Sequence, residues 1–421
     1  MKKPVSVLQM ITVNTYWVGL SFMWNGLMAI VLPAVIANTV PGNEKNTYLG
    51  LLTSIGLVIA VIIQPLSGAL SDSWTSRWGR RRPWITIGTL FDFVFLAVIG
   101  WSGGLTWLFI GYLGLQISSN IAHGPAQGLM PDVVPPEQLA GASGLKIFID
   151  MGSAAVAVVV TGILLGSKAE YAGLVMALII AVFLVTASIT IFGTPEQPST
   201  QTERVSPWKG MIDSFHIDFG VNTAYWWLIG QRFVFLLGVY GIQAFAQNYL
   251  RDVLAVANPP RDTGLLLGSV TFSLILFAVI GGWLINRWGM KQVLILASVV
   301  AAIGSFLLWF GRTQGTILLF GSILGAGVGL FLTANWTLAN KLAPPGEAGK
   351  YLGLTNLATA GGGVVARAAG ALWDVLNNSA PGSWNGYMAL FFSAGVLALA
   401  SITMIGLIEP SPKKEIVNIP S

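Results

Sequence analysis

The 421-residue sequence contains no cysteine, which excludes disulfide bonds, thiolate catalysis and cysteine-ligated metals. It has only two histidines, His123 and His216, which lie far apart, so we expect no histidine-based metal site. Charged residues make up 9% of the chain, whereas a soluble domain carries about a quarter. So few charges cannot cover a water-facing surface of this size, and most of the surface is therefore expected to face lipid.

Recognisable motifs for catalysis are also lacking. The sequence shows no nucleophile triad, glycine-rich phosphate loop or nucleotide-binding motif, so we expect neither an enzyme nor an ATP-driven motor, and no cofactor. The net charge of +5 comes from loop lysines and arginines. We interpret these as topology signals and not as a nucleic-acid-binding surface.

Long apolar segments dominate the sequence, in which 54% of the residues are hydrophobic. Crossing a bilayer takes about 20 residues in a helix. The first segment, from Ile11 to about Ala37, has no small-residue cleavage site and is expected to be a retained helix and not a signal peptide. We predict spans at 12–36, 50–70, 84–101, 106–128, 142–166, 172–193, 225–250, 263–285, 291–310, 316–340, 350–373 and 385–408.

The spans fall into two groups of six, separated by a proline-, serine- and threonine-rich segment. Landmarks repeat between the groups: Arg77-Trp78-Gly79 returns as Arg287-Trp288-Gly289 after 210 positions, and Pro135-Pro136 returns as Pro344-Pro345 after 209. Parallel six-helix repeats are a known transporter plan. The sequence predicts an all-α polytopic membrane protein with twelve transmembrane helices in two pseudo-symmetric halves, comprising residues 1–193, a cytoplasmic linker at 194–224, and residues 225–421.

The distribution of basic residues predicts the orientation. With the N-terminus in the cytoplasm, fourteen of the 22 lysines and arginines fall on the cytoplasmic side and five on the opposite side. Positive residues are retained on the cytoplasmic side of a membrane. Both termini are therefore expected to be cytoplasmic, in what we expect to be a bacterial inner membrane.

The segment between the second and third spans carries the strongest motif. Gly68 is followed four positions later by Asp72, and then by Arg77-Trp78-Gly79-Arg80-Arg81-Arg82-Pro83. This pattern resembles the signature loop of the major facilitator superfamily, and a weaker copy follows the eighth span. We expect a conformational latch on the cytoplasmic face formed by Asp72, Arg77, Gly79, Arg80 and Arg81. The alternative is that these arginines only enforce topology.

The longer basic loop resembles that of glycoside–pentoside–hexuronide:cation symporters, including plant sucrose/proton symporters. A second segment, Asn120 to Asp132, is similar to the sucrose-symporter pattern at Asn120, Gly124, Pro125, Leu129 and Asp132. This resemblance implies the same fold and a sugar or glycoside solute. Gln116, however, stands where that family has an aspartate thought to bind the coupling proton, and glutamine does not titrate.

Polar side chains inside spans are costly in lipid and therefore indicate function. In the superfamily that the chain resembles, the first, fourth, seventh and tenth spans line a central cavity. Amides and aromatic rings together suit a polyol, although single amides also serve as bonds between packed helices. The expected substrate-binding residues are Asn25, Gln116, Asn120, His123, Tyr240, Gln243, Gln247, Asn335 and Trp336.

Three charged residues inside spans are candidates for coupling transport to a proton or sodium ion. Asp92 lies mid-span without a basic neighbour one turn away, whereas Lys146 and Asp150 are four positions apart and can pair on one helix. The alternative is a structural role for each. Arg367, near the outer end of its span, is expected to pair with Asp374.

These features predict a secondary active transporter or facilitator that moves a small polar solute, a sugar or glycoside by resemblance, by alternating access. Its expected partners are that solute, a coupling proton or sodium ion and the lipid bilayer, with no nucleic acid. Two other functions remain open: an exporter of amphipathic compounds, which would need a broad apolar pocket, and a non-transporting pigment- or lipid-handling protein on the same fold.

Overall fold

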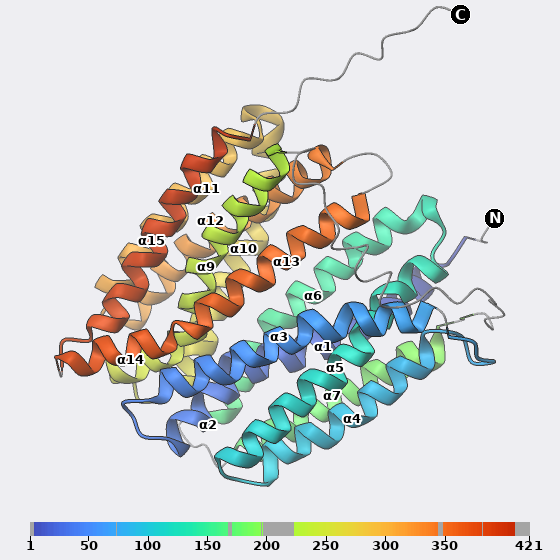
Figure 1. Ribbon diagram of the computed structural model, residues 1–421, viewed down its shortest axis with the longest axis horizontal. Helices are drawn as coiled ribbons and strands as arrows, with labels where there is room; N and C mark the ends of the chain where they lie inside the picture. The colour runs from blue at the N-terminus through green and yellow to red at the C-terminus, as the bar shows by residue number, and fades with distance from the viewer. Residues whose placement is uncertain are drawn as a thin grey trace, which may run out of the picture.

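The computed structural model describes residues 4–72, 74–166, 171–194, 196, 223–343, 348–380 and 382–408. Every regular element within these ranges is helical, and the helices form two bundles that lie against each other (Figure 1). The fold is the predicted one, twelve membrane-crossing helices in two halves. The predicted 194–224 linker lies outside the described residues except at its ends.

The N-terminal half begins with one crossing made of three consecutive helical pieces. The second piece is a π-helical turn, and Pro33 follows it closely. Proline has no N–H to donate, and a π-turn is one way for a helix to accommodate the missing hydrogen bond. The bounds in this half are α1 Val7–Gly26, η1 Leu27–Val31, α2 Leu32–Thr39, α3 Lys45–Asp72, α4 Arg82–Trp101, α5 Leu105–Val133, α6 Pro136–Leu165 and α7 Ala172–Gly193.

The C-terminal half has the same number of crossings, and its eleventh crossing is made of two consecutive helices. Its bounds are α9 Thr223–Asp252, α10 Pro259–Trp288, α11 Met290–Phe310, α12 Gln314–Leu342, α13 Ala348–Ala368 with α14 Gly370–Ser379, and α15 Asn385–Ile405. Ten of the crossings in the described part of the chain are long and apolar enough to span a bilayer.

The halves touch mainly near one face of the molecule. We call the face where α1 begins and α15 ends the terminal face, and the opposite one the distal face. Towards the distal face α6 packs on α10, and α3 packs on α13 and α14. Towards the terminal face the two bundles diverge, as the ribbons of α3 and α13 show (Figure 1).

Small residues allow the close contact at the distal face. A Cβ added at Gly162 would lie 2.6 Å from the carbonyl oxygen of Pro260, and one at Gly264 would overlap the carbonyl oxygen of Val158. Small residues let helix backbones approach each other in a bilayer, where lipid supplies no hydrophobic drive for helices to associate. The α6–α10 contact therefore depends on glycine from each half.

A buried polar cluster also joins the halves at the distal face. We define the interhalf cluster as Lys45, Asn46, Asn248, Asp252, Asp374 and Tyr387, all buried except Asp252, whose side chain is 10% exposed. Lys45 forms an ion pair with Asp252, and Asn46 donates to Asp374 (2.8 Å) and accepts from Asn248 (2.8 Å). Removing one partner of a buried ion pair costs far more than the pair gains, since it leaves a buried charge alone. The cluster therefore favours closure of this face.

Candidate functional site

A cavity of ≈ 330 Å³ lies between the halves. It is lined from the N-terminal half by α1 and α6, and from the C-terminal half by α9, α10, α11 and α12. Its 21 lining residues are Ser21, Asn25, Asp150, Met151, Ala154, Val158, Leu236, Val239, Tyr240, Ile242, Gln243, Ala246, Leu266, Leu267, Val270, Thr271, Leu274, Leu308, Leu324, Val328 and Leu332.

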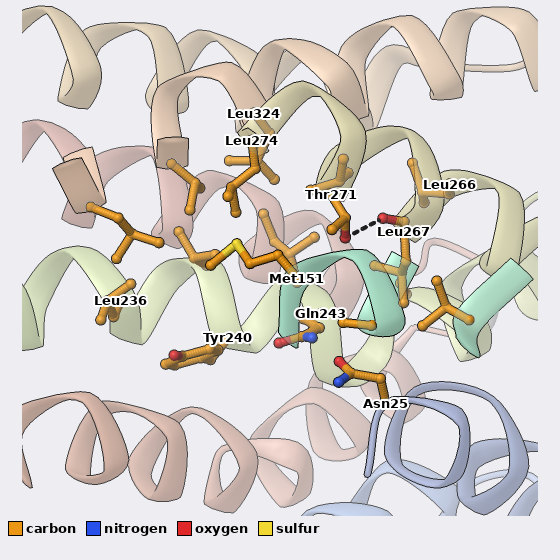
Figure 2. A pocket seen from close by; sticks show the side chains of 18 of the residues that line it. Asn25, Met151, Leu236, Tyr240, Gln243, Leu266, Leu267, Thr271, Leu274 and Leu324 are labelled. Atoms are coloured by element: carbon orange, nitrogen blue, oxygen red, sulfur yellow. Dashed lines mark hydrogen bonds between the residues drawn. The ribbon is translucent and has the colours of Figure 1, made fainter. Parts of the chain in front are cut away.

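Most of this lining is apolar. Figure 2 shows Tyr240, Gln243 and Asn25 along one side, with Met151 and Leu274 across from them. Thr271 uses its hydroxyl to donate to the carbonyl of Leu267 at 2.8 Å, so even this polar side chain is bonded within its own helix. The cavity therefore offers a few hydrogen-bonding groups on one side and an extended apolar wall.

Asp150 is the only carboxylate among the lining residues, which include no lysine or arginine. Its Oδ1 accepts a hydrogen bond from the hydroxyl of Ser21, which joins α6 to α1. The expected pairing with Lys146 is not formed. The Lys146 ammonium lies 3.6 Å from the centre of the Trp17 ring, a cation–π contact that partly replaces hydration of the charge.

A second, smaller cavity of ≈ 20 Å³ adjoins the first, because Asn25 and Gln243 line both. Arg367 lines the smaller one, together with Thr53 and four apolar residues. We call this space the annex. The Arg367 guanidinium therefore places a positive charge close to the main cavity but outside its lining.

Of the nine residues predicted to bind substrate, Asn25, Tyr240 and Gln243 line the main cavity. The three predicted residues of α5 lie elsewhere. Asn120 donates to the Gln116 carbonyl (2.7 Å), Gln116 donates to the Tyr112 hydroxyl (2.7 Å), and the His123 ring packs on Trp17. The spacing that aligns these amides on one helical face also lets them bond to each other along the helix.

The other three predicted residues also lie outside the cavity lining. The Gln247 amide lies against the π-helical turn, where it can donate to the carbonyl of Ile30 at 3.0 Å. Asn335 accepts from Arg232 at 2.8 Å and donates to Gln231 at 3.1 Å. Trp336 is 39% exposed, at a surface position of α12. Gln247 and Asn335 therefore bond to neighbouring groups within the fold.

Asp92 is fully buried inside the N-terminal half, away from the cavity lining. Ser118 of α5 donates a hydrogen bond to one of its carboxylate oxygens. The other oxygen has no hydrogen-bond partner in the described part of the chain. Asp92 thus links α4 to α5, whereas Asp150 faces the space where a solute could lie.

Three of the predicted latch residues, Asp72, Arg80 and Arg81, form an ion-pair cluster with Asp132 at the terminal face, within the N-terminal half. Arg81 pairs with Asp72 at the end of α3. Arg80 donates to both oxygens of Asp132 at 3.1 and 2.6 Å, and Arg81 adds a bond of 3.0 Å. Gly79 has φ +96°, a conformation that favours glycine, while Arg77 is exposed.

Sequence reasoning missed Glu196, which follows α7. Its carboxylate oxygens accept from the backbone N–H groups of Arg80 (2.9 Å), Arg81 (2.8 Å) and Arg82 (3.1 Å). The first N–H groups of a helix lack partners within the helix and favour negative charge. Glu196 therefore caps α4 and ties the end of α7 to it. A single glutamate after a membrane span belongs to no motif, so the sequence alone could not predict that Glu196 caps α4.

The charges of this cluster shift the pKa values of its members. Burial alone would raise the pKa of Asp132, but hydrogen bonds from Arg80 and Arg81 outweigh it and hold that pKa below its usual range. The hydrogen bond to Asp132 raises the pKa of Arg80. Both shifts stabilise the charged forms, so the cluster is ionised at neutral pH.

The sequence is similar to known transporters. It is 25% identical to the multi-drug resistance efflux pump PmrA of Streptococcus pneumoniae over 93% of this chain and 94% of that protein. It is 23% identical to the sucrose transport protein SUC3 of Arabidopsis thaliana, but this match covers 32% of the chain and only 26% of that protein's length.

Solved structures share the fold. A D-xylose–proton symporter has a TM-score of 0.74 at 15% identity, with 96% of this chain and 98% of that chain covered. The nucleoside transporter NupG has a TM-score of 0.71 at 16% identity, with 94% and 98% covered. The family model described as the Major Facilitator Superfamily matches residues 17–367 and 258–419. With this match over most of its length, the chain belongs to the Major Facilitator Superfamily and is an integral membrane transporter, not an enzyme.

Proposed function

We propose that this chain is a secondary transporter that carries an amphipathic solute by alternating access of the two halves to the central cavity. One observation supports this solute class above all: fifteen of the 21 cavity-lining side chains are apolar. The match to an efflux pump over nearly the whole chain is consistent with it.

The free energies of apolar burial and of hydrogen bonding favour an amphipathic solute over a polyol. Each buried CH₂ group contributes about 0.8 kcal/mol, whereas a hydrogen bond contributes a net of about 0.5–1.5 kcal/mol. Asn25, Tyr240 and Gln243 supply few bonds, while leucine and valine from five helices supply a broad apolar surface. A polyol would leave many of its hydroxyls without partners against that wall, which costs binding energy.

A sugar or glycoside remains the second candidate. The D-xylose–proton symporter has the same fold, and the plant sucrose transport proteins match about a third of this chain. The side of the cavity with Asn25, Tyr240 and Gln243 could hold a sugar ring, with Tyr240 stacking on its C–H face. A glycoside with an apolar aglycone would satisfy both sides.

For coupling, we propose Asp150 as the group that exchanges a proton or a sodium ion. Its carboxylate lines the cavity and has no basic neighbour within 4 Å among the described residues. An ion bound there would be released or retained together with the solute. Asp92 is the weaker candidate because its carboxylate is enclosed within one half.

For orientation, we propose that the terminal face is cytoplasmic, that the membrane is the cytoplasmic membrane of a bacterium, and that the structure is the inward-open state. The basic residues of the loop after α3 support the first point. The interhalf contacts at the distal face support the last.

The test is a ligand panel on purified protein in lipid nanodiscs, read as thermal stabilisation. We expect saturable stabilisation by tetraphenylphosphonium or by phenyl glucoside, and none by sucrose or xylose. Gln243→Ala should weaken it, whereas Gln247→Ala, one turn along α9 and outside the cavity, should not. Stabilisation by sucrose or xylose alone would replace the amphipathic solute with a sugar.

A further inference from the structure

Arg367 is a half-buried cation with no acidic partner within 4 Å among the described residues. It lies in the last turn of α13, where α13 packs against α3 of the other half. Its Nη1 donates to the carbonyl of Gly363 in its own helix at 3.2 Å, and its guanidinium lies 5.8 Å from the centre of the Tyr240 ring. None of the carboxylates in the described ranges lies within 4 Å of it.

The expected partner is engaged elsewhere. Asp374 accepts from Asn46 at 2.8 Å and from the backbone and hydroxyl of Thr47 at 2.7 and 2.8 Å. Its oxygens are thus held within the interhalf cluster. Arg367 therefore retains an uncompensated positive charge between the two halves.

Arg232 provides an internal comparison, since it is a buried arginine of the same half. It donates to Thr359 at 2.8 Å and to Asn335 at 2.8 Å, both side-chain oxygens supplied by other helices. Arg367 has only a backbone carbonyl that is one turn away. A guanidinium has five N–H donors, so most of the donors of Arg367 remain available.

The annex beside Arg367 provides room for a ligand. Its volume of ≈ 20 Å³ exceeds the roughly 10–15 Å³ that one water-sized occupant needs. Asn25 and Gln243 line it as well as the main cavity, so an occupant of the annex would lie beside a solute in that cavity.

Withdrawing an unpaired charge from water is costly, and ionisable residues inside membranes therefore mark functional sites. We propose that Arg367 binds a small monoanion in the annex, either a free halide-sized ion or the carboxylate of a molecule whose body lies in the main cavity. The annex is too small for divalent oxyanions, and the body of any larger organic anion would have to lie in the main cavity. The free-ion case does not depend on which solute the chain carries.

The test is the thermal stability of the full-length protein in nanodiscs, titrated with sodium chloride or sodium formate against sodium gluconate at constant ionic strength. We expect a saturable rise in melting temperature with chloride and formate but not with gluconate. Arg367→Gln should raise the apparent dissociation constant about tenfold or more, because a hydrogen bond to a charged group is a strong one.

Two further variants keep the test decisive. Arg367→Lys retains the charge and should retain a weaker response. Arg232→Gln removes a buried arginine that already has side-chain partners and should leave the chloride response in place. Equal responses of the wild type and Arg367→Gln would overturn the proposal, as would a response to gluconate equal to that to chloride.

A series of carboxylates distinguishes the two sources of the anion. If the apparent affinity rises from formate to butyrate to phenylacetate, the anion is the carboxylate of a larger molecule whose apolar part enters the main cavity. If formate and chloride bind and the longer acids do not, the ligand is a free ion. A chain-length effect that persists in Arg367→Gln would show apolar binding alone and would contradict the Arg367 site.

Discussion

At the scale of single residues, two membrane-embedded carboxylates have different surroundings. Asp150 lines the cavity and bonds to Ser21 across two helices, whereas Asp92 is enclosed between α4 and α5. The sequence favoured Asp92 because it lacks a basic residue one turn away. Sequence spacing could not reveal that Lys146 would lie on the Trp17 ring and leave Asp150 without its predicted partner.

We predict that Asp150→Asn abolishes gradient-driven uptake of the stabilising solute into proteoliposomes while exchange at equilibrium persists. An asparagine cannot exchange a proton, but it keeps a hydrogen bond to Ser21. Asp92→Asn is the matched control and should retain the dependence on the gradient. If Asp92→Asn lost gradient dependence and Asp150→Asn kept it, the assignment would be reversed.

A second prediction concerns Asp132, whose pKa lies below its usual range. A depressed folded-state pKa stabilises the fold above the unfolded value of about 3.9, and this contribution is lost as pH falls through the folded value. Asp132→Asn should therefore cost about 1–3 kcal/mol of stability at pH 7, and the difference from wild type should shrink as pH falls below about 4.

Chemical denaturation of detergent-solubilised protein across pH measures this difference. Arg77→Gln is the control, since Arg77 is exposed and surface substitutions usually change stability by less than about 0.5 kcal/mol. A pH-independent cost for Asp132→Asn would mean that its charge contributes nothing to the cluster.

At the scale of helices, hydropathy and turn residues predicted all twelve crossings. The span at 172–193 coincides with α7, and that at 84–101 differs from α4 by two residues. The structure extends other helices, as α6 begins at Pro136 where 142 was predicted, because proline in the first turn starts a helix before its apolar part begins.

The cavity was less predictable than the helices. Polar residues stand out in an apolar sequence, so Asn25, Tyr240 and Gln243 were correctly predicted to line the cavity. The same criterion also selected amides that bond within one half, such as Gln116 and Asn120. Leucine and valine look alike in a sequence whether they face lipid, another helix or a cavity. The apolar wall, which decides the proposed solute class, therefore required the packing of the helices.

The α6–α10 contact gives a prediction at this scale. Gly162→Ala places a methyl group against the carbonyl of Pro260 and should separate the helices, since such overpacking costs about 1–3 kcal/mol. Opening of the distal face should increase labelling of a cysteine at Ser54, whose hydroxyl now bonds to α13. Gly152→Ala is the control on the same helix, with nothing within 4 Å of the added methyl. Equal labelling in both variants would contradict the contact's role.

At the scale of the whole molecule, the absence of cysteine makes topology directly testable. In intact cells, a cysteine at Thr75 should resist a membrane-impermeant maleimide until the cells are permeabilised, while one at Glu44 should react at once. Both positions are exposed, so accessibility of the side chain does not limit either reaction. The reverse pattern would invert the proposed orientation.

The central claim is that the halves alternate in exposing one cavity, and the most direct measurement is a pair of distances. Spin labels at Thr75 and Asn286 report the terminal face, and labels at Glu44 and Ser383 report the distal face; all four residues are exposed. When the stabilising solute is added to protein in nanodiscs, pulsed electron paramagnetic resonance should show the first distance shortening and the second lengthening. If both distances stay unchanged, or both move in the same direction, alternating access between these halves is contradicted.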